Sequence, residues 1–277
     1  CDPLLSSRLS LHLVFERAPF QNDCSNLSLP LDDSPCEEAT IKALKENSER
    51  HPSPFGEYPI NVMRNVARRG APSLLHLVAD IEMEFSSNFT FFVTPLANRI
   101  VLPKVKRALV VRRFEVDSRT SVPRTIAQLK KFHRIKKVFE YHHSIFLPGH
   151  RIPGLWNWFD VSLPEMSPRS LPMEYMSPQW EPQVILHADD PMNDESIPTR
   201  HKDQQALVYE LCRAGYHFEV ASHGFNVHRG IRNKTSPMEA AVMMANKRGR
   251  FKALSAYRIR LDRMYPDTKL LCGNFSL

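Results

Sequence analysis

Glycine is scarce in this chain, with 9 residues among 277, whereas proline occurs 22 times. Because proline restricts the backbone, this balance predicts long, stiff and ordered loops. The sequence has no glycine-rich phosphate loop, no RNA-binding motif and no zinc-finger spacing, although its formal net charge is +7. Basic clusters within residues 99–137 and 247–263 are more often solvated helix faces. We therefore expect no nucleic-acid partner, and nucleic-acid binding is kept only as an alternative based on charge.

Cysteine is also sparse, and none of the five cysteines belongs to a Cys-x-x-Cys pair, which argues against a zinc or redox site. In an oxidising compartment Cys24 and Cys36 could close a short loop, and Cys212 and Cys272 a long one. The sequence does not fix this pairing, and one thiol must remain free or pair elsewhere.

Long hydrophobic runs are absent too, since no stretch is long enough to cross a bilayer and no signal peptide precedes Cys1. N-glycosylation sequons begin at Asn26, Asn88, Asn233 and Asn274. They favour the secretory pathway, so we expect the Golgi lumen, with contact to a membrane only through an anchor outside this sequence.

Helical and strand patterns alternate along the chain, which predicts an α/β fold with a mostly parallel central sheet, in a single domain covering residues 1–277. In the second expected helix, Ile60, Met63 and Ala67 recur on one face, which is expected to be the buried face. The expected strands are residues 9–15, 74–79, 108–116, 183–187 and 217–221. The expected helices are residues 36–49, 59–70, 123–132, 203–213 and 237–264, the first with a capping box of Ser34 and Glu37.

An acidic pair follows the apolar run at residues 74–79, which has the pattern of a strand buried on both faces in the middle of a sheet. Asp80 and Glu82 are two residues apart, so on an extended segment both carboxylates point the same way. Ligands of open α/β sheets bind beyond such strand ends, and paired carboxylates suit Mn²⁺ or Mg²⁺. A solvated acidic loop, or a cap for the following helix, is the alternative.

The helix before this pair carries a distinctive set of residues, which are Tyr58, Pro59, Asn61, Arg64, Asn65 and Ala67. Followed by an apolar strand and an acidic pair, this set resembles glycosyltransferase family 49, which includes β-1,4-glucuronyltransferase and the LARGE-type xylosyl-glucuronyltransferase domain. Further similar blocks occur in the same order, at Phe114–Val116, Gly149–His150, Trp180–Pro182, Tyr209–Leu211 and Gly224–His228.

The resemblance implies a GT-A fold, the nucleotide-diphospho-sugar transferase type. It implies transfer of a sugar, glucuronic acid or N-acetylglucosamine, from a UDP-sugar to a hydroxyl of a glycan or glycoprotein. Asp80, Glu82 and His228 would hold Mn²⁺ or Mg²⁺, although a histidine taken alone is more often a core residue. Tyr58, Asn61, Arg64 and Asn65 would bind the nucleotide. Glu181, Asp194 or Asp203 would act as general base, with Glu181 and Asp194 preferred.

Three features depart from the family pattern. The second metal carboxylate is Glu82 instead of aspartate, and residues 198–203 lack the two glycines of the family's loop. The family's first strand also has no counterpart, so we expect the domain to be truncated at its N-terminus. These departures support an alternative, a non-catalytic glycan-binding pseudoenzyme of the same fold.

Overall fold

The computed structural model describes residues 8–14, 20, 42–43, 45–47, 50, 58–163 and 167–276. The chain divides into two compact units, Cys1–Tyr58 and Pro59–Leu277. In the first unit residues 9–14 form no strand, so the strand expected over residues 9–15 is wrong at every position that is described. Residues 42–43, 45–47 and 50 are helical, whereas Cys24, Cys36 and the expected capping box lie outside the described residues.

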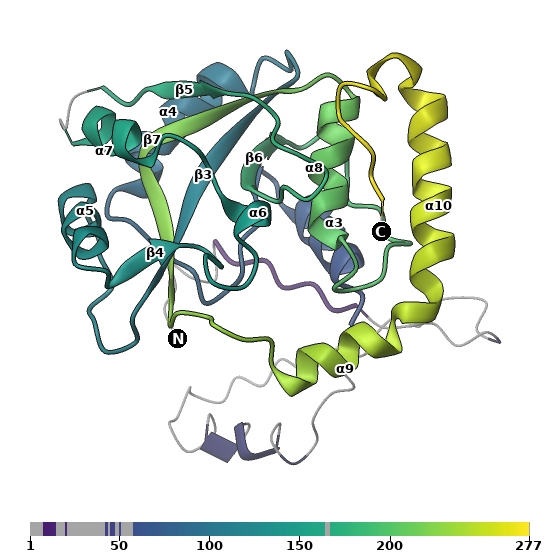
Figure 1. Ribbon diagram of the computed structural model, residues 1–277, viewed down its shortest axis with the longest axis horizontal. Coiled ribbons are helices and arrows are strands. Elements are labelled where there is room, and N and C mark those ends of the chain that lie inside the picture. The colour runs from purple at the N-terminus through teal and green to yellow at the C-terminus, as the bar shows by residue number, and fades with distance from the viewer. Residues whose placement is uncertain are drawn as a thin grey trace. The chain divides into compact units, whose positions relative to one another are not determined.

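The second unit is a mixed α/β domain built on a seven-stranded sheet (Figure 1). The strands follow the order β1-β6-β3-β7-β2, with β4 on β3 and β5 on β7. The strands are β1 Leu75–Leu77, β2 Glu84–Phe85, β3 Arg107–Val116, β4 Val138–Glu140, β5 Ser170–Met173, β6 Gln183–His187 and β7 His217–Arg229. The helices are α3 Ile60–Gly70, α4 Phe89–Ile100, α5 Ile126–Arg134, α6 Leu147–His150, α7 Leu155–Ser162, α8 Asp203–Arg213, α9 Pro237–Ala245 and α10 Lys247–Met264, with a 3₁₀ turn η2 Pro266–Thr268.

The expected mostly parallel sheet is wrong. Within the described part of the chain, β3 and β7 are the one parallel pair, and the other neighbours run antiparallel. Alternation of helices and strands indicated the fold class correctly but not strand direction. The reason is that β6 and β7, the strands on either side of α8, lie on opposite sides of β3 and run in opposite directions.

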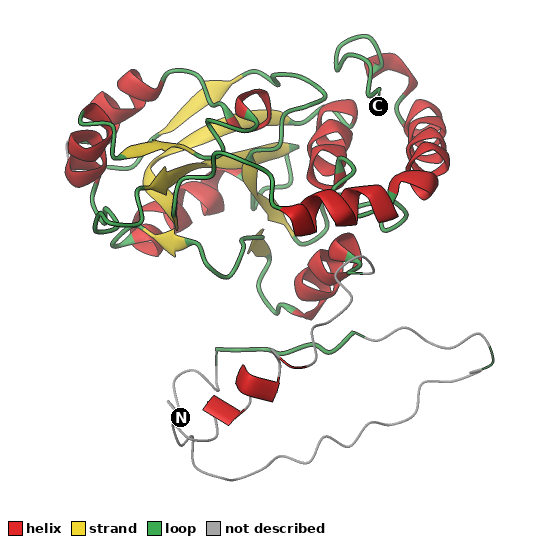
Figure 2. Cartoon of the chain, turned by 60° about the horizontal axis from the view of Figure 1, so that its bottom comes forward, coloured by secondary structure: helices red, strands yellow, loops and turns green. Residues whose placement is uncertain are grey.

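Strand β3 lies at the centre of the core because consecutive side chains enter opposite layers. Ala108 and Val110 pack with α5, α7 and α8, whereas Leu109 and Val111 pack with α4. All four side chains are completely buried. Helices therefore cover both faces of the sheet, as Figure 2 shows for the strands and the helices around them.

Strand β1 differs from its prediction. It pairs with β6 at one end of the strand order, and its residues are half-buried on either side of His76. The expectation that this strand is buried on both faces in the middle of the sheet is therefore wrong for the described residues. Its apolar composition is that of a buried strand, but its pairing places it at an edge.

Helix α3 has the expected bounds but buries the other face. Asn61, Asn65 and Arg68 are 1–3% exposed, whereas Ala67 is exposed and Met63 is half-buried. The prediction failed because it assumed that apolar residues face inward, while this helix packs against backbone carbonyls that require donors.

The C-terminal helix expected over residues 237–264 is two helices, α9 and α10, which meet at Asn246. Ser236 and Glu239 form a capping box that starts α9. Leu254, Tyr257 and Leu261 of α10 pack against α8, beside which α10 runs in Figure 1.

A disulfide joins Cys212 at the end of α8 to Cys272 near the C-terminus, which confirms the longer of the two suggested pairings. It closes a loop with a sequence separation of 60 and a Cα–Cα distance of 6.0 Å. Both α9 and α10 lie within this loop, so the bond ties the C-terminal segment to α8.

Replacing both cysteines, Cys212→Ser with Cys272→Ser, is expected to lower the free energy of unfolding by about 2–4 kcal/mol, because a closed loop of this length restricts the unfolded chain. Chemical denaturation under oxidising conditions measures the change. Wild-type protein with the bond reduced is the matched control and should lose a similar amount. A double variant as stable as the oxidised wild type would contradict the assigned role of the bond.

Candidate active site

A cleft of about 390 Å³ is lined by four parts of the domain. These are the segment after β4, Glu181 just before β6, the loop and first turn of α8, and side chains of α9, α10 and the loop before α9. Its walls combine apolar side chains, including Ile145, Phe146 and Leu254, with titratable groups. This mixture of apolar surface and a few polar groups is typical of small-molecule sites. Glu181, a predicted general base, is among the residues that line this cleft.

The guanidinium of Arg113, on β3, organises the inner wall of this cleft. It donates to Nδ1 of His150 at 2.9 Å and to the backbone oxygen of Glu181 at 3.0 Å, and it lies 4.4 Å from the ring centre of Tyr141. A guanidinium has no acceptor, so Nδ1 of His150 must accept and the proton of the neutral ring is on Nε2. That nitrogen lies 2.9 Å from Oε1 of Glu181 and 3.0 Å from Nδ1 of His142.

Burial sets the protonation of these groups. It raises the pKa of Glu181 to about 8, against the opposing charge of Arg113. It also lowers the pKa of both His142 and His150 to about 2, with neighbouring positive groups acting in the same direction. At neutral pH the histidines are neutral and Glu181 carries a proton. A carboxyl group with a pKa near 8 is suited to exchange a proton with a hydroxyl group at physiological pH.

The acidic pair Asp80 and Glu82 lies on a turn, closed by a bond of 3.1 Å from the amide of Met83 to the carbonyl oxygen of Asp80. The expected extended segment is therefore wrong, and alternation along a strand does not govern where the two carboxylates point. Both residues are exposed, and neither side chain has a hydrogen bond or ion pair within the described ranges. Their carboxylates remain available to a ligand.

His228 lies near the end of β7, where its Nδ1 donates to the backbone oxygen of Gly230 at 3.1 Å. This bond leaves Nε2 as the lone-pair nitrogen, which is the protonation state that binds metals. The ring centre of His228 lies 6.1 Å from that of Tyr141.

The donor chemistry of Asp80, Glu82 and His228 thus suits a hard divalent cation, but their positions do not complete a site. In the described part of the chain, no three His, Cys, Asp or Glu residues lie close enough together to hold a metal ion. No chemical step is therefore derived through a metal here.

The nucleotide residues predicted on α3 are engaged with a loop that follows β6. Asn61 donates to the backbone oxygen of Asp194 at 2.8 Å and receives a bond of 3.0 Å from Arg64. Asn65 donates to the backbone oxygen of Asn193 at 2.8 Å and accepts from its amide at 2.9 Å. Tyr58 is 46% exposed and lies two residues before the start of α3.

Asp194, also a predicted general base, instead makes contacts that stabilise this same loop. Its Oδ1 accepts from the amide and hydroxyl of Ser196, and its Oδ2 pairs with Arg260 at 3.1 Å. Among the described residues it does not line the cleft that contains Glu181.

Sequence reasoning did not single out Arg113 or His142, and it included Glu115 only as part of a block similar to the family. Glu115 is completely buried on β3 opposite His228, and its Oε1 has no hydrogen-bond partner. The Phe114–Val116 block contains this residue, and a glutamate between two apolar residues of an expected strand was the signal that could have drawn attention to it.

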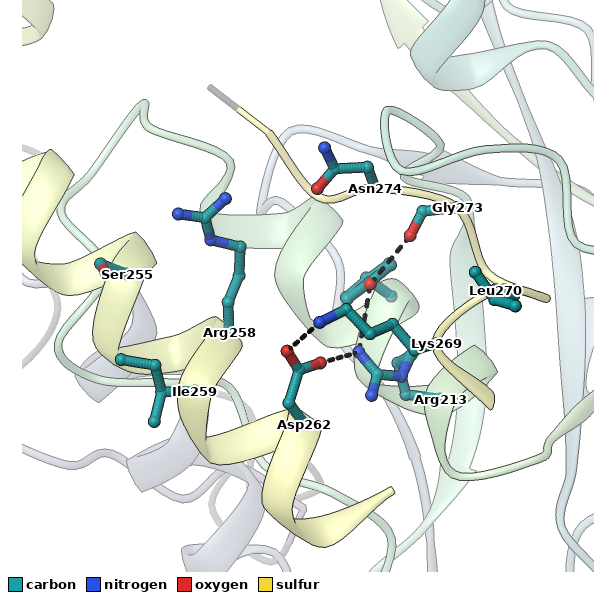
Figure 3. Close-up of a pocket in the computed structure, with 10 residues that line it drawn as sticks. Arg213, Ser255, Arg258, Ile259, Asp262, Lys269, Leu270, Gly273 and Asn274 are labelled. Atoms are coloured by element: carbon teal, nitrogen blue, oxygen red, sulfur yellow. Dashed lines mark hydrogen bonds and ion pairs between the residues drawn. The ribbon is translucent and has the colours of Figure 1, made fainter. Parts of the chain in front are cut away.

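A second cavity of about 380 Å³, drawn in Figure 3, lies between α8, α10 and the C-terminal segment. Arg213 is 1% exposed and donates to Asp262, which also pairs with Lys269. Tyr209 donates to the backbone oxygen of Gly273. Arg213, Asp262 and Lys269 pair with one another, so these charged groups stabilise the packing of α8 and α10 against the C-terminal segment.

Comparison with known proteins identifies the family. The family model described as glycosyl-transferase for dystroglycan, glycosyltransferase family 49, matches residues 1–266. The chain belongs to glycosyltransferase family 49. The resemblance inferred from the blocks between Tyr58 and His228 is thereby confirmed.

The most informative relatives are named transferases. β-1,4-Glucuronyltransferase 1 of Danio rerio is 29% identical over 178 residues, 63% of this chain and 41% of the relative. The Homo sapiens protein of that name is 28% identical over 224 residues, 78% of this chain and 50% of the relative. Xylosyl- and glucuronyltransferase LARGE1 of Gallus gallus is 23% identical over 172 residues, 62% of this chain and 22% of the relative. The chain spans half the length of these relatives or less.

The raised pKa of Glu181 predicts how stability depends on pH. The unfolded chain releases this proton near pH 4.5 and the folded chain near pH 8, so rising pH favours unfolding between these values. The stabilising contribution of the buried neutral histidines is complete above pH 6.5. Between pH 6.5 and 8, the free energy of unfolding of wild type should fall, relative to Glu181→Gln, by up to about 1.4 kcal/mol per pH unit. Denaturation series at several pH values measure this slope.

The exposed Glu174 offers the matched control, since Glu174→Gln should keep the wild-type slope. Parallel curves for wild type and Glu181→Gln across this window would show that Glu181 is not protonated in the fold.

The polar packing of α3 gives a second test. Asn65→Asp removes the donor to Asn193 and places a carboxylate against that carbonyl oxygen and against Glu195. We expect a loss of about 2–4 kcal/mol in the free energy of unfolding. The same substitution at the exposed Asn98 should change stability by less than about 0.5 kcal/mol. An Asn65→Asp variant as stable as Asn98→Asp would contradict the role of this contact.

Proposed function

We propose that the chain is the GT-A-type transfer domain of a glycosyltransferase that moves glucuronic acid or N-acetylglucosamine from a UDP-sugar to a glycan hydroxyl. The observation that carries this proposal is the carboxyl group of Glu181, which lies 2.9 Å from Nε2 of His150 in the wall of a cleft of about 390 Å³. Family membership supports sugar transfer, and the similarity to β-1,4-glucuronyltransferases supports glucuronic acid as the donor sugar.

In the proposed reaction the carboxylate form of Glu181 accepts the proton of an acceptor hydroxyl. The hydroxyl oxygen then bonds to the anomeric carbon of the donor sugar, while the bond from that carbon to the diphosphate breaks and UDP leaves. His150 donates through Nε2–H and so holds the carboxyl group in place, and Arg113 fixes the His150 tautomer. These residues orient the base and keep it away from bulk water.

Asp80, Glu82 and His228 are the proposed ligands of Mn²⁺ or Mg²⁺. The ion would neutralise charge on the departing diphosphate. The unpaired, exposed carboxylates and the lone-pair nitrogen at Nε2 of His228 support this assignment. Glu82 is one methylene longer than the aspartate of the family pattern, which a flexible cation site tolerates.

Tyr58 and Arg64 are the proposed contacts to the nucleotide from the start of α3. Asn61 and Asn65 would contribute through the loop that they hold, since their side chains are buried against it. Asp194, paired with Arg260, would support that loop, and Glu181 is the preferred base.

The second candidate is a glycan-binding pseudoenzyme of the same fold. It is favoured by the absence of a converged set of three metal ligands among the described residues, together with Glu82. This candidate keeps the cleft at Glu181 for glycan binding and predicts no binding of UDP with a metal.

We place the protein in the secretory pathway, in the Golgi lumen, with a glycan or glycoprotein as acceptor. The Cys212–Cys272 disulfide supports an oxidising compartment, and the sequon asparagines Asn88, Asn233 and Asn274 are exposed to modification. Every helix in the described ranges is too short or too polar to span a lipid bilayer.

A thermal-shift titration with UDP tests the proposal. With Mn²⁺ and UDP at about 100 times its Kd, we expect about 2.7 kcal/mol of stabilisation and a rise of several degrees in Tm. Asp80→Asn should remove the metal-dependent part of this rise, whereas Glu82→Asp should increase affinity for the metal.

The matched control is Asp267→Asn, which removes an exposed carboxylate in η2 and should leave the UDP response unchanged. If UDP gives no rise in Tm with or without Mn²⁺, the pseudoenzyme is the better description.

A further inference from the structure

Cationic side chains dominate the cleft that contains Glu181. Its four Lys and Arg residues are accompanied by a single carboxylate, Glu239, besides Glu181 itself. Because the carboxyl group of Glu181 has a pKa near 8, it adds little negative charge at neutral pH. The four basic lining residues are Arg200, Lys202, Arg232 and Arg250.

Three of these four cations have partners within the protein. Arg200 and Arg232 share the carboxylate of Glu239, Arg200 at 2.8 Å. Lys202 donates to the backbone oxygen of Ser276. Two guanidinium groups on one carboxylate leave an excess positive charge in the cleft.

Arg250 is the exception. Its guanidinium has no hydrogen bond or ion pair with any residue in the described ranges, and it lies 4.9 Å from the ring centre of Phe251. Its Nε is buried without a partner. A buried, unpaired donor on a charged group is costly, so its retention in the wall of a cleft points to a ligand that it binds.

The loop that carries Arg200 and Lys202 is under backbone strain. Both residues adopt left-handed conformations, with φ of 68° and 63°, which cost about 1–2 kcal/mol for a residue with a Cβ atom. Strain of this kind concentrates at binding sites. The loop is also the segment in which this chain lacks the glycines of the family pattern.

We propose that Arg250, with the Arg200–Glu239–Arg232 cluster beside it, forms a subsite for an anionic group, a carboxylate or phosphate, on the acceptor glycan. A guanidinium binds either group through two parallel hydrogen bonds. Ile145, Phe146 and Leu254 supply apolar wall for the sugar ring. The proposed metal ligands Asp80, Glu82 and His228 are not among the described residues that line the cleft, whereas the proposed base Glu181 is. Assigning the anion to the acceptor rests on the proposed function.

Direct titration of the whole chain with three monosaccharides tests the subsite. The probes are D-glucuronate, D-glucose 6-phosphate and neutral D-glucose, at constant ionic strength, with affinity measured by calorimetry or ligand-observed NMR. We expect at least one anionic sugar to bind at least about 10-fold more tightly than glucose. Which of the two binds identifies the group as a carboxylate or a phosphate.

The matched pair of variants is Arg250→Gln and Arg248→Gln. Each removes one guanidinium from α10, but Arg248 is exposed and does not line the cleft. Arg250→Gln should weaken binding of the anionic sugar about 10-fold, whereas Arg248→Gln should leave it unchanged. Arg250→Lys should give an intermediate loss, because it keeps the charge and lacks the planar fork.

Several results would overturn the subsite. These are equal binding of glucose and both anionic sugars, no binding of any sugar, or equal losses in the Arg250→Gln and Arg248→Gln variants. Circular dichroism of each variant confirms that it is folded. The UDP and Mn²⁺ titration is independent, so an anionic sugar that binds a protein unable to bind UDP would support the subsite and refute the transferase proposal.

Discussion

The charged hydrogen bonds of Arg113 hold the candidate site together. This guanidinium leaves the central strand β3 and contacts His150, the backbone of Glu181 and the ring of Tyr141, which come from three other segments. Because it only donates, it fixes the His150 tautomer and aims a proton donor at Glu181. The position of the proposed base depends on this one group, whereas burial raises the pKa of Glu181 against the charge of Arg113.

Polar side chains perform a similar task elsewhere in the domain. Helix α3 contacts the loop after β6 through the donors of Asn61, Asn65 and Arg68, which satisfy backbone carbonyls that no strand pairs with. Because these hydrogen bonds hold the loop after β6 in place, the loop does not need a cover of apolar side chains. Such directional contacts specify one geometry more strictly than apolar packing does.

Burial explains the positive electrostatic potential of the cleft that contains Glu181. Removing Glu181 and two histidines from water favours their neutral forms, so the fixed guanidinium groups decide the net charge. A base with a raised pKa and a cationic lining are compatible, because the protonated acid does not cancel the positive field. The same arrangement favours an anionic sugar over a neutral one.

Local sequence determined several helices and strands, including β3, β6, α3 and α8, together with the family. It also identified Asp80, Glu82 and His228 as metal-ligand types. Tertiary structure alone decided strand direction, the polar inner face of α3, the turn at Asp80 and the meeting of Arg113 with His150. Periodicity reports which side of an element is apolar, whereas strand pairing, hydrogen-bond partners and protonation depend on residues far apart in the chain.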